Sequence, residues 1–99
     1  MNTLETLKIK LRDLKPKLQQ DYQVTQLGLF GSYVRGEQTE NSDIDILVEF
    51  APEVSFGLVT FCTLENQLSD SLGQKVDLVM KDALKPHIGK KILEEVIYL

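Results

Sequence analysis

Asp43 and Asp45, two aspartates separated by one residue, are the side chains of this sequence best suited to chemistry. They lie in the segment DIDILV, which is predicted to form a β-strand. A strand places residues i and i+2 on one face, so both carboxylates point one way and Ile44, Ile46 and Val48 point into a core. Neighbouring carboxylates repel each other unless a cation lies between them. Mg²⁺ is the simplest candidate because it prefers carboxylate oxygens and keeps room for water and phosphate.

A candidate phosphate-binding turn, Gly31-Ser32, precedes this pair and follows the apolar residues 27–30, which are predicted to end a buried strand. Glycine lets the backbone approach a ligand closely, and serine offers a hydroxyl and an N–H. A helix that starts after Ser32 would add positive potential for phosphate at its N-terminus.

Gly31-Ser32, ten further residues and then Asp43-x-Asp45 resemble the signature of the nucleotidyltransferase superfamily that includes DNA polymerase beta. The segments GSYVRGE and SDIDILV are similar to its smallest members, the minimal nucleotidyltransferases, and the resemblance covers about residues 24–97. It implies an α+β fold with a small mixed β-sheet, helices packed mainly on one face and the metal site on the exposed face. Many of these relatives pair with a HEPN-type partner in bacterial and archaeal toxin–antitoxin modules.

A third acid, Asp77, interrupts an apolar strand predicted over residues 75–80. An unpaired carboxylate is costly to bury, so Asp77 either faces solvent or belongs to the metal site. The resemblance favours the metal site, because the family's third acid commonly lies in a similar hydrophobic-Asp-hydrophobic strand. Glu49 is the rival: it shares a face with the aspartate pair but lies one pleat farther along the strand.

The resemblance implies transfer of a nucleoside monophosphate, most simply AMP from ATP, to a hydroxyl group. Asp43 and Asp45 are expected to hold one Mg²⁺ that bridges the triphosphate, and with Asp77 a second that binds the attacking hydroxyl. Two such ions about 3.5–4 Å apart stabilise both the entering and the leaving oxygen. Asp77 is also expected to accept the proton of that hydroxyl, while Gly31 and Ser32 cradle the β- and γ-phosphates.

Arg35 follows the turn closely enough to reach a phosphate with its fork of donors. It could instead be solvated or pair with Glu37 or Glu40, and the sequence leaves both interpretations open.

Four further residues have a functional and a plain interpretation. Tyr33 could stack on a ligand, but packing is favoured. Lys75 could approach phosphate, but solvation is favoured. His87 is predicted to lie on the surface, because a single histidine cannot form a zinc site. Cys62 is predicted to be a small core residue near the apolar stripe of a helix.

Composition predicts one soluble domain spanning residues 1–99. The net charge of −4 argues against non-specific binding of nucleic acid, although residues 1–20 carry a net +3. The single cysteine excludes an intramolecular disulfide and fits a reducing cytosol. No apolar run suits a membrane span or a secretory signal, so a cytoplasmic protein is expected.

A leucine stripe predicts an amphipathic helix over residues 1–20, with Thr3 as its N-cap and with Pro16 kinking or thinning its last turn. Strands are predicted over residues 24–30 and 44–50, with a short helical turn over 33–36 between them. The stripe comprises Leu4, Leu7, Leu11, Leu14 and Leu18.

The second half predicts a helix over residues 56–72, capped by Ser55 and ended by Gly73. A last helix begins at Pro86, and residues 96–99 form an edge strand or dock on a partner. The apolar stripes of these helices are Phe61, Leu64, Leu68 and Leu72 in the first, and Ile88, Ile92, Leu93 and Val96 in the last.

The chain has no obvious acceptor-binding domain, so a partner chain or self-association must supply the acceptor. The resemblance implies a HEPN-type toxin as partner, with this chain as the antitoxin that adenylylates it. Two alternatives are a non-catalytic module that masks its partner or senses nucleotide, and a subunit of a small-molecule nucleotidyltransferase, such as one that modifies antibiotics. The intact Gly-Ser turn and three aspartates favour catalysis.

Overall fold

The computed structural model describes residues 2–52 and 57–99. In chain order, its helices and strands are α1 (Leu4–Tyr22), β1 (Val24–Phe30), α2 (Ser32–Arg35), β2 (Ile44–Phe50), α3 (Leu58–Leu72), β3 (Val76–Met80), the 3₁₀ turn η1 (Lys81–Ala83), α4 (Pro86–Glu95) and β4 (Ile97–Tyr98).

The four strands form one mixed sheet in the order β3-β2-β1-β4. β1 is antiparallel to both β2 and β4, whereas β2 and β3 are parallel. Parallel neighbours need a crossover connection, and α3 supplies it between β2 and β3. The predicted mixed sheet and both long strands are therefore confirmed, the strands with their predicted limits of 24–30 and 44–50.

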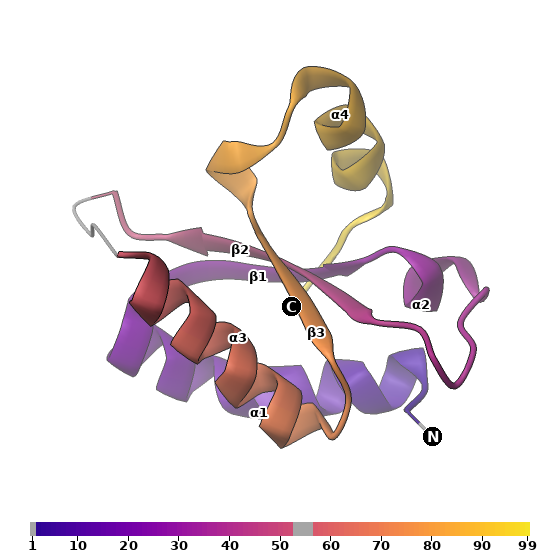
Figure 1. The fold of residues 1–99 in the computed structure, drawn as a ribbon, viewed down its shortest axis with the longest axis horizontal. Helices are drawn as coiled ribbons and strands as arrows, with labels where there is room; N and C mark the ends of the chain where they lie inside the picture. Colours follow the sequence, from indigo (N-terminus) through magenta and orange to yellow (C-terminus); the bar gives the residue numbers. More distant parts are fainter. Residues whose placement is uncertain (1, 53–56) are drawn as a thin grey trace.

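The hydrophobic core lies between one face of the sheet and the two long helices, α1 and α3, which lie side by side on that face (Figure 1). Alternate residues of β2 supply the sheet side of the core, as predicted. The core-facing buried residues of the three elements are Leu7, Leu11 and Leu18 of α1, Ile44, Ile46 and Val48 of β2, and Leu64, Leu68 and Leu72 of α3. α1 and α3 do not cover the opposite face of the sheet, although Leu47 on that face is also buried.

α1 begins at the predicted N-cap and continues past its internal proline. The Thr3 side chain accepts a hydrogen bond from the Thr6 backbone N–H at 3.2 Å, which confirms the predicted N-cap. Pro16 lies inside α1, and the helix continues past it to Tyr22. The proline therefore does not end the helix, which runs two residues beyond the predicted limit of 20.

The described part of α3 has Gly57 at its N-cap and ends at Gly73, whose φ of 70° is easily adopted only by glycine. The predicted cap Ser55 and first residue Phe56 lie outside the described residues. The prediction for Cys62 was wrong, because its side chain is exposed. One residue turns a helix by about 100°, so Cys62 is rotated away from the stripe that begins at Phe61.

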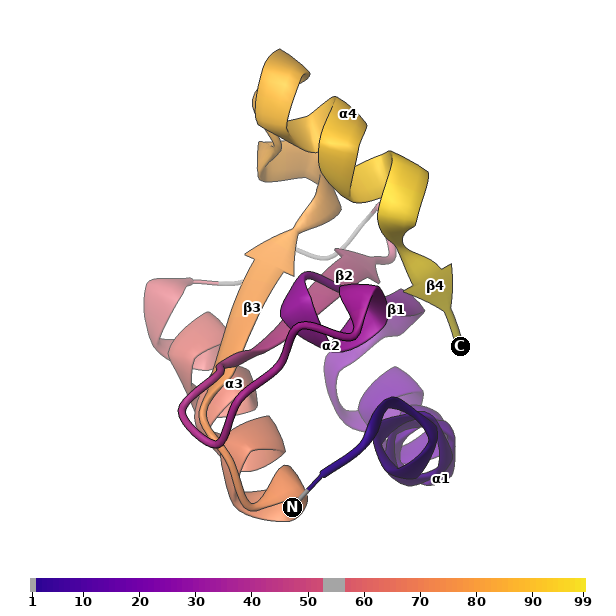
Figure 2. The ribbon, with the colours of Figure 1, turned by 90° about the vertical axis from the view of Figure 1, so that its right-hand side faces the viewer.

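α4 begins at Pro86, as predicted, but its apolar face is largely uncovered. Ile88 is 61% exposed and Leu93 is 45% exposed. Gly89 is the one buried residue of this helix, and a Cβ there would lie 2.9 Å from the Cβ of Leu84. α4 stands on the side of the sheet opposite α1 and α3, and β4 returns the chain to the edge of β1 (Figure 2). The predicted edge strand near the C-terminus is thus confirmed.

Across residues 2–52 and 57–99, each helix is too short or too polar to cross a bilayer.

The packing of α1 predicts a contrast between two of its residues. Leu11 is fully buried and Ile9 is 59% exposed. Leu11→Ala should lower the free energy of unfolding by about 2–5 kcal/mol, because the cavity cannot close completely. Ile9→Ala, the control in the same helix, should change it by less than about 0.5 kcal/mol. Urea unfolding followed by circular dichroism measures the free energy of unfolding of both variants. Equal losses in the two would contradict the burial of Leu11 in the core.

Candidate functional site

Strand pairing brings the predicted acidic residues together. Asp45 of β2 lies opposite Asp77 of β3 in the parallel register, and opposite Phe30 of β1 on its other side. Asp43 immediately precedes β2. The side chain of Asp45 is half-buried and that of Asp77 is exposed, on the sheet face that α1 and α3 leave free. The structure thus places all three aspartates in one region, as the sequence predicts.

Gly31 packs directly against Asp45. Its φ of 82° is a conformation that only glycine adopts readily. A Cβ at this position would lie 2.0 Å from Oδ2 of Asp45 and 2.8 Å from its Cγ, closer than any side chain allows. Glycine is therefore required both by the backbone and by the carboxylate beside it. The next residue, Ser32, begins α2, which is a single turn ending at Arg35.

The acidic cluster perturbs the ionisation of its central member. Burial, reinforced by the charges of Asp77 and Asp43, raises the pKa of Asp45 to about 6, and Glu95 contributes in the same direction. Arg35 opposes this shift. A carboxylate held among other carboxylates in this way is stabilised in its charged form by a cation.

Asp43 has one cationic neighbour. Lys75 Nζ lies 3.8 Å from Oδ2 of Asp43, and both side chains are well exposed. Lys75 is therefore close to the acidic cluster while remaining in solvent, so an ion pair of this kind contributes little to stability.

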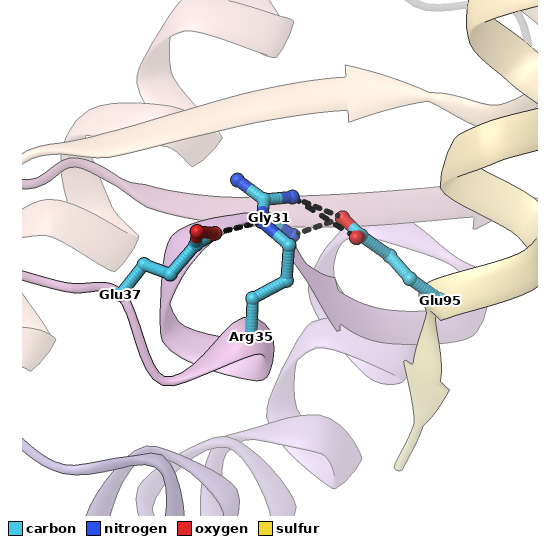
Figure 3. A network of polar contacts seen from close by, with 4 residues as sticks. All are labelled: Gly31, Arg35, Glu37 and Glu95. Carbon is cyan, nitrogen blue, oxygen red and sulfur yellow. Dashed lines mark hydrogen bonds and ion pairs between the residues drawn. The ribbon is translucent and has the colours of Figure 1, made fainter.

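The structure places beside these groups a residue that the sequence analysis did not single out, Glu95 at the end of α4 (Figure 3). Its Oε2 accepts a hydrogen bond from the Gly31 backbone N–H at 2.6 Å. Both of its carboxylate oxygens lie 3.0 Å from Nη1 of Arg35, and Nε of Arg35 donates to Glu37. These carboxylates raise the pKa of Arg35, Glu37 first and then Glu95. The residues around Glu95 in the sequence give no indication that it contacts Gly31 and Arg35, because both partners lie far away along the chain.

The remaining candidates have structural environments of their own. The rival acid Glu49 pairs with Lys81 at 3.6 Å. Tyr33 is buried in the core, which confirms the packing interpretation. His87 is exposed, as predicted.

A cleft of about 630 Å³ lies between this end of the sheet and α4. Gly31, Arg35 and Asp45 line it from the sheet side, and Ile88 and Ile92 are among its lining residues on α4. It therefore combines the predicted phosphate-binding groups with a wall of α4 that carries both apolar and charged side chains, the latter being Lys91, Glu94 and Glu95.

The donor set suits a hard divalent cation, because aspartate oxygens are the ligands that Mg²⁺ prefers. The strand register and the raised pKa of Asp45 agree with such a role. Within residues 2–52 and 57–99, however, no three His, Cys, Asp or Glu side chains converge on a point where a metal ion would fit. The backbone therefore brings the aspartates into one region without directing their carboxylate oxygens at a common point.

The comparisons agree with this geometry. The model of the nucleotidyltransferase domain matches residues 11–99. Protein adenylyltransferase MntA of Thermococcus cleftensis is 48% identical over 99 residues, which cover 100% of this chain and 98% of that protein. A solved structure described as a minimal nucleotidyltransferase has a TM-score of 0.79 at 34% identity, covering 99% of this chain and 97% of the other. A chain of a toxin–antitoxin complex with AMP-PNP has a TM-score of 0.68 at 29% identity, covering 93% and 68%.

The raised pKa of Asp45 predicts a pH dependence of stability. Between its ordinary pKa of 3.8 and the folded value of about 6, the folded chain binds more protons than the unfolded chain. The free energy of unfolding should therefore fall as the pH rises through this range. Asp45→Asn removes the charge and should be more stable than the parent above about pH 6, by roughly 1–2 kcal/mol after screening by solvent. This advantage should vanish below about pH 4.

Chemical unfolding in EDTA between about pH 3.5 and 8 measures this difference. Asp70→Asn is the matched control, because Asp70 is an exposed acid of α3. Its pH dependence should follow that of the parent. A parallel profile for Asp45→Asn as well would show that Asp45 does not titrate abnormally.

Proposed function

Because the chain belongs to the nucleotidyltransferase domain family, we propose that it transfers AMP from ATP to a hydroxyl group of a HEPN-type toxin and so acts as its antitoxin. The observation that carries this proposal is the contact of Gly31 with Asp45, directly opposite Asp77. A glycine turn able to approach phosphates lies against a carboxylate cluster able to hold a cation. Nucleotidyl transfer needs these two capacities next to each other.

In the proposed reaction the acceptor hydroxyl attacks the α-phosphorus of ATP. A bond forms between the acceptor oxygen and phosphorus, the bond from the α-phosphorus to the oxygen bridging to the β-phosphate breaks, and pyrophosphate leaves. Asp77 accepts the proton of the hydroxyl, and its exposure gives an acceptor from outside access to it. Gly31, Ser32 and Arg35 hold the β- and γ-phosphates.

Mg²⁺, when bound by Asp43, Asp45 and Asp77, supplies charge neutralisation for the phosphates and the attacking oxygen. Asp45 must then be ionised although its pKa lies near 6, and a bound cation favours that state. We propose that two such Mg²⁺ ions bind.

The proposal that the acceptor belongs to a second protein rests on likeness to chains of toxin–antitoxin complexes. The similar chain crystallised with AMP-PNP is part of a toxin–antitoxin complex. A HEPN-type toxin therefore fits the acceptor role better than a small molecule.

The acidic cluster predicts a stability response to metal and nucleotide. Mg²⁺ with ATP should raise the melting temperature, because a ligand that binds only the folded state stabilises it by mass action. The Asp43→Asn, Asp45→Asn double variant should lose this response. Glu49→Gln is the matched control on the same strand and should keep it, since Glu49 pairs with Lys81. A response lost in Glu49→Gln and kept in the double variant would move the site to Glu49.

The transfer itself predicts a change in mass. Incubation with ATP, Mg²⁺ and the cognate HEPN-type toxin should add one or more AMP groups to the toxin, about 329 Da each, detectable by intact-protein mass spectrometry. Asp77→Asn should slow the addition by roughly 100-fold or more while complex formation persists. If the toxin is neutralised without any added mass, and Asp77→Asn neutralises it equally well, the chain is a masking module.

A further inference from the structure

The groups proposed to bind the triphosphate already have an anionic partner within the chain. The Glu95 carboxylate accepts a hydrogen bond from the Gly31 backbone N–H at 2.6 Å (Figure 3). Both of its oxygens also accept from Nη1 of Arg35 at 3.0 Å. A backbone N–H and a guanidinium are the donors that a phosphate group also selects. Glu95 therefore presents to the site the same kind of ligand, a charged oxygen pair, that a nucleotide brings.

Glu95 and the triphosphate of a nucleotide cannot both accept hydrogen bonds from the Gly31 N–H and the whole Arg35 guanidinium. The Gly31 N–H carries a single hydrogen, and Glu95 uses it. Arg35 donates from Nη1 to Glu95 and from Nε to Glu37, so its charge is balanced by two carboxylates. A triphosphate that arrives beside them meets repulsion from Glu95 as well as competition for its donors.

We propose that Glu95 is an internal competitor for the phosphates of the nucleotide, and that nucleotide binding releases the end of α4 from the Gly31 turn. This inference rests on the proposed function, because it concerns the same phosphate-binding groups. Glu95 lowers nucleotide affinity in the resting chain and holds Gly31 and Arg35 in place until a nucleotide takes over its hydrogen bonds.

The packing of α4 makes such a release feasible. In the described part of the chain, the side-chain hydrogen bonds and ion pairs between α4 and the rest of the protein all come from Glu95. Only Gly89 of this helix is buried. β4 remains paired with β1 through Gly28 opposite Tyr98 and Leu29 opposite Ile97, so the chain stays attached when the helix moves. The cleft between α4 and the sheet then changes shape with the nucleotide.

Calorimetric titration with Mg²⁺ and AMP-PNP tests the competition. Glu95→Gln keeps the size of the side chain and a carbonyl acceptor for Gly31, but removes the charge. It should bind AMP-PNP roughly fivefold to twentyfold more tightly than the parent, and inorganic tripolyphosphate should show the same gain because the competition concerns phosphates. Glu94→Gln removes the same charge from another residue that lines the cleft, but one that makes no hydrogen bond to Gly31 or Arg35, and should change either affinity by less than about twofold.

A second measurement follows α4 directly. Hydrogen exchange of the α4 amides should be faster in Glu95→Gln than in the parent without nucleotide, and AMP-PNP should accelerate it in the parent. Glu95→Asp keeps the charge but shortens the side chain by one methylene, and should give an intermediate gain in affinity. Melting curves of all variants establish that they are folded.

The outcomes separate this inference from the proposed function. If the parent binds AMP-PNP and Glu95→Gln binds it equally or less tightly, Glu95 supports the site and does not compete, while the proposed function stands. If Glu94→Gln gains as much affinity for AMP-PNP as Glu95→Gln, the loss of any negative charge explains the gain, and the inference is overturned. If neither the parent nor Glu95→Gln binds AMP-PNP, the proposed function fails and the inference fails with it.

Discussion

The candidate site depends on the hydrophobic core that forces three aspartates together. Ile44 and Ile46 are fully buried under α1 and α3, and in a strand this leaves Asp45 on the opposite face. A slip of one residue would exchange the two faces, so burial also determines the register. The parallel pairing of β2 with β3 places Asp45 opposite Asp77. Apolar burial therefore offsets two costs at Asp45, its own desolvation and its repulsion by Asp77 and Asp43, which together raise its pKa to about 6. A bound cation would relieve the repulsion.

Gly31 links the acidic cluster to the phosphate-binding groups. Its missing side chain leaves room for the Asp45 carboxylate, and its N–H is directed at Glu95. The guanidinium of Arg35 lies between Glu95 and Glu37. Arg35 is thus paired with two carboxylates of the chain itself, and a metal–nucleotide complex that enters the site would change this charge balance. This balance explains why a carboxylate from a distant helix occupies donors suited to phosphate.

α4 differs from the other long helices in how little it buries. α1 and α3 each bury three leucines against the sheet, whereas α4 buries only Gly89 and leaves Ile88 mostly exposed. An element held at its ends and by one polar contact opens at a lower free-energy cost than a core helix. The sheet and its two packed helices therefore position the aspartates, and α4 is the wall of the cleft that we propose to move.

The sequence by itself determined what depends on neighbouring residues. Alternation and turn chemistry predicted the limits of β1 and β2, the cap at Thr3, the end of α3 at Gly73 and the start of α4 at Pro86. The spacing of the Gly-Ser turn and the aspartates identified the family. Periodicity failed at Cys62, since a residue beside an apolar stripe can lie on either side of the helix.

The tertiary structure decided the contacts across the chain, although the resemblance already implied that Asp77 lies beside Asp43 and Asp45. The pairing of Asp45 with Asp77, the contact of Glu95 with Gly31 and Arg35, and the exposed face of α4 join segments far apart in the sequence. The alternation of apolar residues decides which face of a strand is buried, but the choice of neighbouring strand and the docking of α4 arise from the packing of the whole core.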